Sequence, residues 1–538
     1  MSAVNLKSQA VPEPEQAGPK DISSFTWTLL SGIIMLTGAF LRLYDLALKP
    51  LHHDEGVNGF FLQRLVKEGV YHYDPANYHG PTLYYFALVS TSLNSFFRGN
   101  SGLSTVAVRL VPALFGIATI WLVLCLRRHI GSIGALTAAA LLALSPGAVY
   151  MSRYFIHESL FVFFTLGIVV ASLRYYESAN PVYLMLASAS AALLFATKET
   201  AMISAGVLLI ALAATAMYVP LRMAVANERR PQTGKRSRNA PPDTLSETRQ
   251  RFDNPVLIIG WALAAIILFV IVYLLFYSSF LTYAKGVSDS LKTFKIWART
   301  GKNDHVHEWY TYLMWLWQEE GAVLGLGTAG VVVALWRARN RFAVFAALWA
   351  IGIIAAYSLI PYKTPWLALN FIVPLAIIGG YGIEALYRWG ADDLQQRALV
   401  LALALAALFT SGYQMIRLNF QHYDDEQYVY PYAHTVRELL PLVDNLNRFA
   451  VSAGTGAQTP INITSPEYWP LPWYLRDYTR VGYAGRVAIS NEPLIIGSEA
   501  QELELESALG DRYRRIGTYP LRPNVTLVLY ARRDLAEH

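Results

Sequence analysis

Long apolar runs, separated by short polar stretches, recur along the first 416 residues of this 538-residue chain. Most of the runs reach the roughly 17–25 residues that a helix needs to cross the hydrocarbon layer of a bilayer. They predict about eleven spans, at residues 22–41, 110–126, 131–150, 159–173, 179–197, 201–220, 256–280, 321–336, 342–361, 365–383 and 398–416. The pattern therefore predicts an α-helical polytopic membrane protein.

The pattern changes after residue 416. Residues 417–538 are charged and mixed, and their short apolar stretches predict a helix at 432–448 and a strand at 460–464. A helical segment near 469–476 and a β-α-β-β succession over 493–530 complete the prediction. We expect a small α/β domain at the C-terminal end of the membrane region.

Composition supports this division. The chain is 54% hydrophobic and only 15% charged, whereas soluble domains carry about 25% charged residues. The single cysteine, Cys125, lies in a predicted span, so no internal disulfide is expected. The first span follows a polar tail, residues 1–21, and lacks a small-residue cleavage pattern. We interpret it as a retained anchor rather than a signal peptide.

The positions of Lys and Arg predict the orientation, because these residues mark cytoplasmic loops. They follow alternate spans, at Arg127, Arg128, Arg174, Arg337, Arg339, Arg341, Arg388 and Arg397, and they crowd the segment 221–255. The tail 1–21 and the basic loop 221–255 are then cytoplasmic. The loops 42–109 and 281–320 and the α/β domain 417–538 are then extracytoplasmic. This scheme requires residues 82–97 to form an interfacial or re-entrant helix rather than a span.

The predicted outer loops collect acids and bases at the edge of the membrane. The run His52-His53-Asp54-Glu55 follows the first span, and Lys198-Glu199 sit between two apolar runs with almost no loop. Charged groups at a membrane edge are costly and mark functional sites. Loops are polar in any protein, but that explanation does not account for Lys198-Glu199.

Several short motifs occur in one order and on one predicted side of the membrane. They are Asp54-Glu55, Tyr73-Asp74-Pro75, Tyr78-His79-Gly80-Pro81, Arg109-Leu110-Val111-Pro112, Arg153 with His157-Glu158, Phe195 through Thr200, and Tyr362 through Trp366. Together they resemble the C-type glycosyltransferase superfold, the multi-span enzymes that take a sugar from a polyprenyl phosphate. The similarity is greatest to a prokaryotic family related to protein O-mannosyltransferases and known as flippase-activity-associated proteins.

The resemblance implies a GT-C-like membrane domain over residues 22–416, with a catalytic loop at 42–109. The donor would be a polyprenyl-phosphate-linked sugar, and the acceptor a protein or a glycan. Glycosyl transfer needs a base for the acceptor hydroxyl, and a carboxylate at a desolvated membrane edge can supply one. We expect Asp54 to be the base, Glu55 to be an alternative base or to orient the acceptor, and Glu158 to be a second acidic element.

Cationic groups stabilise the negative charge that grows on a departing phosphate. The candidates for this role are Arg153, Lys198 and Lys363, although each could instead be a snorkelling side chain at a span end. Other polar residues of the motifs are expected to bind substrate, namely His53, Tyr78, His79, His157 and Glu199.

A divalent metal remains open, since some relatives in the superfold use one and others do not. His305, His307 and Glu308 place potential ligands on one loop, but no strong zinc signature such as HExxH is present. Histidines that bind substrate or phosphate fit the pattern better.

The basic loop 221–255 predicts contact with anionic membrane lipids and no nucleic-acid partner.

The aromatic run in the C-terminal domain has two readings, a sugar site or an ordinary core. It comprises Tyr468, Trp469, Trp473, Tyr474, Tyr478 and Tyr483.

For the whole protein, the alternative to an enzyme is a non-catalytic flippase or transport component for lipid-linked sugars. Transporters usually bind substrate at mid-membrane between repeated halves. The acids here lie in the outer loops and no halves repeat, which favours the enzyme.

Overall fold

Each predicted span coincides with an apolar helix or a bent pair of helices. The computed structural model describes residues 21–76, 79–99, 101–228, 254–300, 305–390, 393–488 and 491–536. The helices are α1 (Ser24–Leu43), α4 (Thr105–Leu124), α6 (Ser132–Leu144) with α7 (Pro146–Ser152), α8 (Glu158–Ser178), α9 (Pro181–Phe195), α10 (Ala201–Glu228), α12 (Pro255–Tyr277), α15 (Gly321–Arg337), α16 (Arg341–Leu359), η1 (Pro365–Ala368) with α17 (Leu369–Trp389), and α18 (Leu394–Ile416).

Eight of these are long and apolar enough to cross a membrane, or up to ten if each of two bent pairs is one span, within the described ranges. Helix α9 is apolar but has only 15 residues. The chain is therefore a multi-pass membrane protein, and the α-helical polytopic fold class is confirmed.

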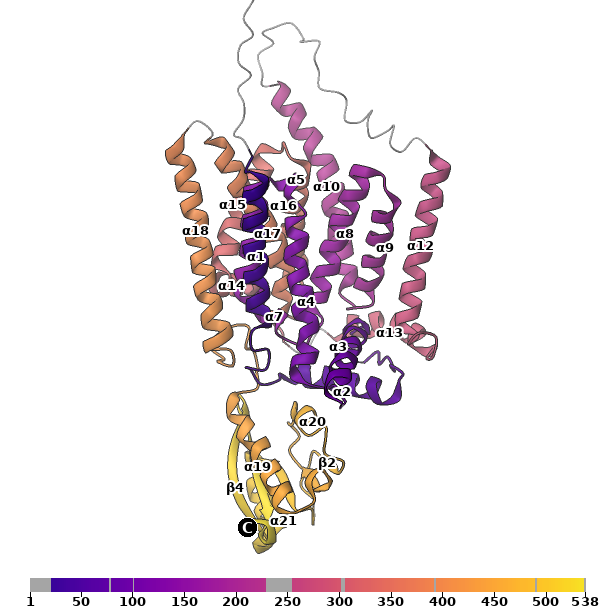
Figure 1. Ribbon diagram of the computed structural model, residues 1–538, viewed down its shortest axis with the longest axis vertical. Coiled ribbons are helices and arrows are strands. Elements are labelled where there is room, and N and C mark those ends of the chain that lie inside the picture. The colour runs from indigo at the N-terminus through magenta and orange to yellow at the C-terminus, as the bar shows by residue number, and fades with distance from the viewer. Residues whose placement is uncertain are drawn as a thin grey trace, which may run out of the picture.

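Helix α17 forms the centre of the bundle, whereas α12 and α18 lie at its opposite edges (Figure 1). Contacts with α17 depend on glycine, which lets backbones approach closely inside a membrane. A Cβ on Gly330 of α15 would lie 2.0 Å from the Ile378 carbonyl oxygen, and one on Gly380 would lie 2.2 Å from the Gly134 oxygen. Apolar side chains of α12 instead cover the outside of the bundle, where lipid replaces protein.

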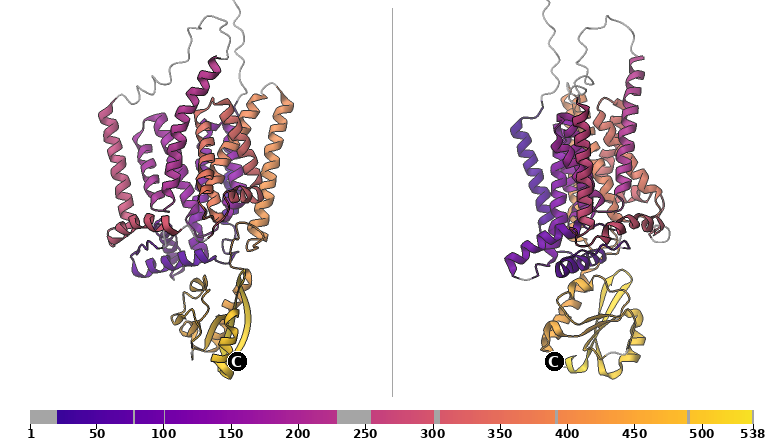
Figure 2. Two further views of the ribbon diagram at one scale, coloured as in Figure 1. Left: turned by 180° about the vertical axis from the view of Figure 1, so that it is seen from behind. Right: turned by 90° about the vertical axis from the view of Figure 1, so that its right-hand side faces the viewer.

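The predicted outer loops are largely helical. Helices α2 (His53–Glu68), α3 (Thr82–Arg98), α13 (Lys285–Thr300) and α14 (Thr311–Glu319) gather at one end of the bundle (Figures 1 and 2). Helix α3, over the segment expected not to span, is absent from the membrane-length helices found among the described residues. Helix α14 meets α15 at an angle of 115°. The sequence pattern did not predict α2 or α13, because interfacial helices carry no long apolar run.

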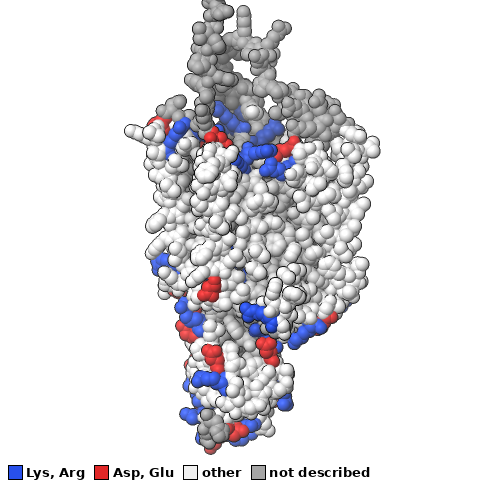
Figure 3. Space-filling model, viewed as in Figure 1, with Lys and Arg blue, Asp and Glu red and all other residues white. Residues whose placement is uncertain are grey.

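The basic span ends lie together at the other end of the bundle. Figure 3 shows a broad band without charged residues, with Lys and Arg gathered above it and again toward the C-terminal domain. A short helix, α5 (Arg127–Ile130), lies at that end. Helix α10 continues through residue 228, so the first part of the predicted loop 221–255 is helical. Residues 229–253 of that loop and residues 1–20 of the predicted tail lie outside the described residues.

A five-stranded sheet forms the core of the C-terminal α/β domain, with strand order β2-β1-β3-β5-β4. Strands β2, β1 and β3 are parallel, and β5 runs antiparallel to β3 and β4. The strands are β1 (Ile461–Ile463), β2 (Val481–Tyr483), β3 (Leu494–Ser498), β4 (Tyr513–Arg522) and β5 (Val525–Arg532). The helices and turns are η2 (Arg417–Gln421, a π-helical turn below α18), η3 (Arg437–Leu439), α19 (Leu440–Ser452), η4 (Gly456–Gln458), α20 (Leu471–Tyr474), η5 (Glu499–Gln501), α21 (Glu502–Leu509), η6 (Gly510–Arg512) and α22 (Arg533–Ala536).

Two details of this domain differ from the sequence prediction. The helix expected from residue 432 begins at 437, because the preceding segment is extended and the Val436 amide donates to the Leu521 carbonyl. Strand β2 was not predicted, since three residues are too few to show an alternating pattern.

Candidate functional site

The N-terminus of α2 presents two adjacent carboxylates in different surroundings. His52 caps the helix, because its Nδ1 accepts the Asp54 amide at 3.0 Å, and the Glu55 carboxylate accepts the His52 amide in return. This reciprocal capping begins the helix at His53. Consecutive residues of a helix point in different directions, so the side chain of Glu55 is fully enclosed while that of Asp54 remains 39% exposed.

Glu55 forms a saturated buried ion pair with Arg109. The guanidinium donates to both carboxylate oxygens at 2.6 and 2.7 Å, and the amides of His52 and Phe155 donate at 3.0 and 2.8 Å. Burial alone would raise the pKa of Glu55, but Arg109 holds it below its ordinary value. Other Arg109 hydrogens go to carbonyls, those of Leu46, Lys49 and Pro50. All four lone-pair positions of Glu55 are thus occupied, which argues against its expected alternative role as a base.

Asp54 makes fewer contacts. Within the described part of the chain, its carboxylate accepts no hydrogen bond, and His52 Nδ1 lies 3.9 Å from Oδ2. That nitrogen already accepts a hydrogen bond from the Asp54 amide. His52 therefore caps the helix and is not available at this atom to accept a proton from a substrate. The Asp54 carboxylate is therefore fixed at its backbone and accessible at its tip, as a base requires.

A second charged group surrounds Lys198, in the turn between α9 and α10. Its Nζ donates to Glu158 Oε1 at 2.6 Å, and the neighbouring Glu199 pairs with His79 at 3.2 Å. Burial favours the neutral form of Lys198, but the two carboxylates hold its pKa above the ordinary value. An ammonium has three hydrogens, and the other two have no hydrogen-bond acceptor among the residues that the structure describes.

Glycine allows two distant loops to build this group. The Gly80 amide donates to the Thr197 carbonyl at 3.0 Å, and Thr82 Oγ1 donates to Thr197 Oγ1 at 2.8 Å. A Cβ on Gly80 would lie 2.1 Å from the Ala196 carbonyl oxygen. Any other residue at position 80 would push the loop that carries His79 away from Glu199.

His157 lies beneath His79, with ring centroids 4.9 Å apart. Its Nε2 lies 3.1 Å from the Gly80 carbonyl oxygen, whereas its buried Nδ1 has no partner within the described ranges. Burial, together with His79 and Lys198, holds the pKa of His157 well below its ordinary value. His157 is therefore a neutral ring with one polar atom left for a ligand.

Tyr362, in the loop between α16 and α17, lies within electrostatic reach of both groups. Burial raises its pKa to about 12, and its charged neighbours include Lys198, Asp54 and Glu199. Asp54 and the Lys198 group therefore both lie within electrostatic reach of the same tyrosine. The run Tyr362–Trp366 pointed to this loop from the sequence, but no pattern singled out the tyrosine.

Two expected phosphate ligands bind backbone instead. Arg153 donates to the carbonyls of Leu41, Tyr44 and Asp45, and its guanidinium packs on the Phe420 ring. Lys363 Nζ donates to the carbonyls of Ser358 and Ile360 at 3.1 and 2.6 Å, at the C-terminal end of α16. These contacts give both cations a structural role, and their predicted contact with a phosphate stays a prediction.

The candidate metal ligands do not come together. His305 Nδ1 lies 2.9 Å from the Tyr432 hydroxyl, and the His307 ring packs on Trp315. In the described residues, no three His, Cys, Asp or Glu side chains form a group that could hold a metal, and this includes Glu308. Two further predicted site residues lie elsewhere. The centroid of the His53 ring lies 6.0 Å from that of the Trp469 ring. Tyr78 lies outside the described residues.

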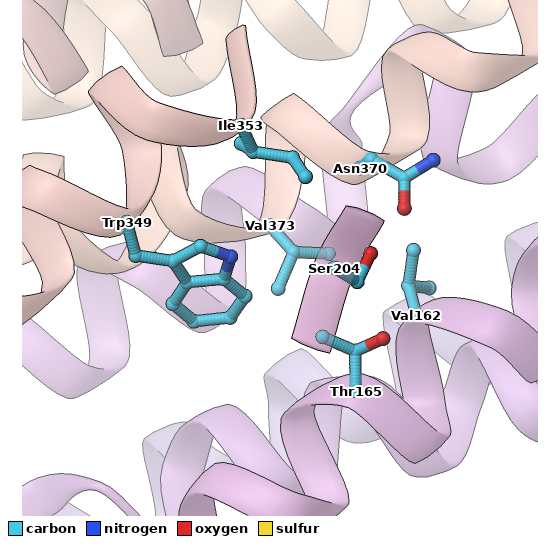
Figure 4. Close-up of a pocket in the computed structure, with 7 residues that line it drawn as sticks. All are labelled: Val162, Thr165, Ser204, Trp349, Ile353, Asn370 and Val373. Carbon is cyan, nitrogen blue, oxygen red and sulfur yellow. The ribbon is translucent and has the colours of Figure 1, made fainter. Parts of the chain in front are cut away.

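Two cavities lie apart from these residues. One, of about 10 Å³, has room for a single water and lies inside the bundle (Figure 4), lined by Val162, Thr165, Ser204, Trp349, Ile353, Asn370 and Val373. The other, of about 400 Å³, lies between α14 and α18 and is lined by Gln318, Glu319, Tyr413, Gln414, Arg417, Gln427 and Tyr428. Neither cavity is lined by a residue of the Asp54 or Lys198 groups.

Comparison with known proteins supports the fold. Residues 78–225 match the family model described as dolichyl-phosphate-mannose-protein mannosyltransferase. ArnT from Cupriavidus metallidurans is similar in the apo state, with a TM-score of 0.62 and 15% identity over 94% of this chain and 98% of that one. Its form bound to undecaprenyl phosphate gives 0.60, with the same identity and coverage.

The Archaeoglobus fulgidus oligosaccharyltransferase tethered to an acceptor peptide gives a TM-score of 0.56 at 13% identity, over 90% of this chain and 70% of that one. No curated protein sequence matches the chain significantly. The expected resemblance is confirmed for the fold, which is that of the C-type glycosyltransferases. The matched range 78–225 contains His79, His157, Glu158, Lys198 and Glu199.

Proposed function

From this fold we propose that the protein is an integral-membrane glycosyltransferase that moves a sugar from a polyprenyl phosphate to an acceptor hydroxyl. The observation that carries the proposal is an accessible carboxylate, Asp54, and a buried cationic group around Lys198, which both lie within electrostatic reach of Tyr362. The similarity to ArnT bound to undecaprenyl phosphate supports a lipid-linked donor. The basic ends of the spans at the other end of the bundle support an extracytoplasmic location for the site and the C-terminal domain.

Asp54 acts as the general base. Its carboxylate takes the proton of the acceptor hydroxyl as that oxygen attacks the anomeric carbon of the sugar. The bond between this carbon and the phosphate oxygen breaks, and its electron pair leaves with the polyprenyl phosphate. The proton stays on Asp54 until solvent removes it. A positioned base of this kind contributes about 10²–10⁴-fold to the rate.

Lys198 stabilises the charge that grows on the leaving phosphate. Glu158 orients its ammonium, and the two remaining Nζ hydrogens, which have no acceptor among the described residues, can bind phosphate oxygens. His79, His157 and Glu199 provide polar atoms beside it, and His157 Nδ1 has no hydrogen-bond partner in the part of the chain that the structure describes. Arg153 and Lys363 support the surrounding loops.

The test is a transfer assay with the full chain in nanodiscs. Radiolabelled polyprenyl-phosphate sugars serve as donors and a membrane extract as the source of acceptor. We expect Asp54→Asn to lose at least about 100-fold in transfer, with unchanged thermal stability and donor affinity. Glu68→Gln, which removes an exposed carboxylate at the far end of α2, should keep wild-type activity.

Normal turnover of the Asp54→Asn variant would refute its assignment as the base. Donor binding by the wild-type protein without transfer to any acceptor would favour the alternative, a non-catalytic flippase or transport component that carries lipid-linked sugars.

A further inference from the structure

The C-terminal domain is seated directly on the helix that carries Asp54. Gly56 and Gly59 lie one turn apart on α2 and face the segment around α20. A Cβ on Gly56 would lie 2.6 Å from Pro470 Cβ, and one on Gly59 would lie 2.4 Å from Trp473 Cε3. The Leu51 amide also donates to the Tyr474 hydroxyl at 2.9 Å. These contacts fix the position of the domain beside Asp54.

Not every ring of the aromatic run is used in this seating. Trp473 is 3% exposed and fills the space above Gly59, so it belongs to the packed interface. Trp469 and Tyr468 are only half-buried, and Tyr483 is 40% exposed. The run therefore divides into rings that dock the domain and rings that remain accessible.

The accessible rings form a row that begins at the active-site helix. His53 contacts Trp469 at 6.0 Å between centroids, Trp469 contacts Tyr468 at 5.8 Å, and Tyr468 contacts Tyr483 at 5.0 Å. His53 directly precedes Asp54 and lies within electrostatic reach of its carboxylate, so one end of the row lies near the proposed base. We call these four residues the aromatic shelf.

Charged groups border the shelf. Arg522 and Glu467 form an ion pair, and both lie within electrostatic reach of His53. Glu467 is largely exposed, so its carboxylate can accept hydrogen bonds from a ligand. Small-molecule sites combine aromatic side chains with a few polar groups that fix the orientation of the ligand, and the shelf and its border offer both.

We propose that the aromatic shelf binds a sugar ring of the acceptor, so that the acceptor is a glycan rather than a polypeptide. The C–H faces of a sugar pack on Trp469 and Tyr468, while its hydroxyls reach Glu467 and Arg522. A glycan laid along the row from Tyr483 to His53 presents its terminal hydroxyl to Asp54. This inference rests on the proposed transferase function and assigns its acceptor.

Binding is tested apart from transfer. Saturation-transfer NMR on the full chain in nanodiscs uses methyl glycosides of mannose, glucose and galactose, and a serine- and threonine-containing peptide of similar mass. We expect saccharide binding to wild type, a loss of about tenfold in affinity for Trp469→Ala and a smaller loss for Tyr483→Ala. Trp469→Phe, which keeps an aromatic face, should restore most of the affinity.

Trp389→Ala is the matched control, since this tryptophan is also exposed but lies at the C-terminal end of α17, away from the shelf. Thermal stability and donor affinity should stay at wild-type values in both shelf variants, which separates a binding role from a docking role. In the transfer assay, the acceptor KM should rise about tenfold for Trp469→Ala while the donor KM is unchanged.

Equal saccharide affinity in wild type, Trp469→Ala and Tyr483→Ala would overturn the shelf, as would binding of the peptide alone. Saccharide binding that depends on Trp469, in a protein that transfers nothing, would support the shelf and refute the transferase. Transfer to a glycan with an unchanged acceptor KM in both variants would support the transferase and refute the shelf.

Discussion

The two buried ion pairs at this end of the bundle differ in how completely they are bonded. In the pair of Glu55 and Arg109, every carboxylate lone pair has a donor. In the group around Lys198, two ammonium hydrogens and His157 Nδ1 are without protein partners among the described residues. Buried polar groups are normally bonded, and exceptions need an explanation. The comparison supports a structural role for the first pair and the proposed ligand-binding role for the second.

The largest expected effect is on stability at the saturated pair. Glu55→Gln leaves the Arg109 guanidinium buried without its counter-charge, which should lower the free energy of unfolding by about 3–5 kcal/mol. Thermal unfolding of the purified protein near neutral pH measures it. Asp54→Asn, the neighbouring substitution at an exposed position, should unfold at the wild-type temperature. A Glu55→Gln variant as stable as wild type would end the distinction between the two pairs.

Substitution at the unsaturated group should affect the donor. Lys198→Met keeps the length of the side chain but removes the charge-assisted hydrogen bonds, each worth about 1.5–3 kcal/mol. Donor affinity should fall about 10- to 100-fold, as measured with a labelled polyprenyl-phosphate sugar. Lys363→Met is the matched control, because this ammonium caps α16, and it should bind the donor normally. Unchanged affinity in Lys198→Met would remove Lys198 from the phosphate site.

Acid should weaken the saturated pair. The folded protein holds the pKa of Glu55 below its ordinary value of 4.5, so the pair stabilises fully above that pH. The unfolded chain binds a proton at Glu55 more tightly than the folded protein does. The contribution of the pair is therefore lost as the pH falls from 4.5 through the lowered pKa. The difference in unfolding temperature between wild type and Glu55→Gln should be constant above pH 5 and shrink below pH 4.5. A difference that does not change with pH would contradict the buried charge.

The smallest effect is expected at the domain contact. Gly59→Ala places a methyl group against Trp473, and overpacking of this kind costs about 1–3 kcal/mol. The C-terminal domain should become more sensitive to limited proteolysis and transfer should slow. Gly32→Ala in α1, where a Cβ would meet nothing within 4 Å, should behave as wild type. Resistance to protease in both variants would show that this contact does not hold the domain.

The sequence predicted the spans well because run length and polarity decide whether a helix crosses a membrane. It missed α2 and α13, whose polar faces break the apolar runs. For the site, short motifs located the right loops but not the state of each side chain. Whether Glu55 is saturated depends on Arg109, and whether Arg153 is available depends on carbonyls near Leu41. Such partners are far away in sequence, and only packing of the helices decides them.

The position of Tyr362 has a consequence for biogenesis. Asp54 and the Lys198 group belong to segments that a ribosome makes early, whereas the loop between α16 and α17, which carries Tyr362, is made late. A nascent chain that is still being inserted thus contains Asp54 and Lys198 but not yet Tyr362. The proposed site is then complete only after α16 and α17, which flank the loop of Tyr362, have been inserted.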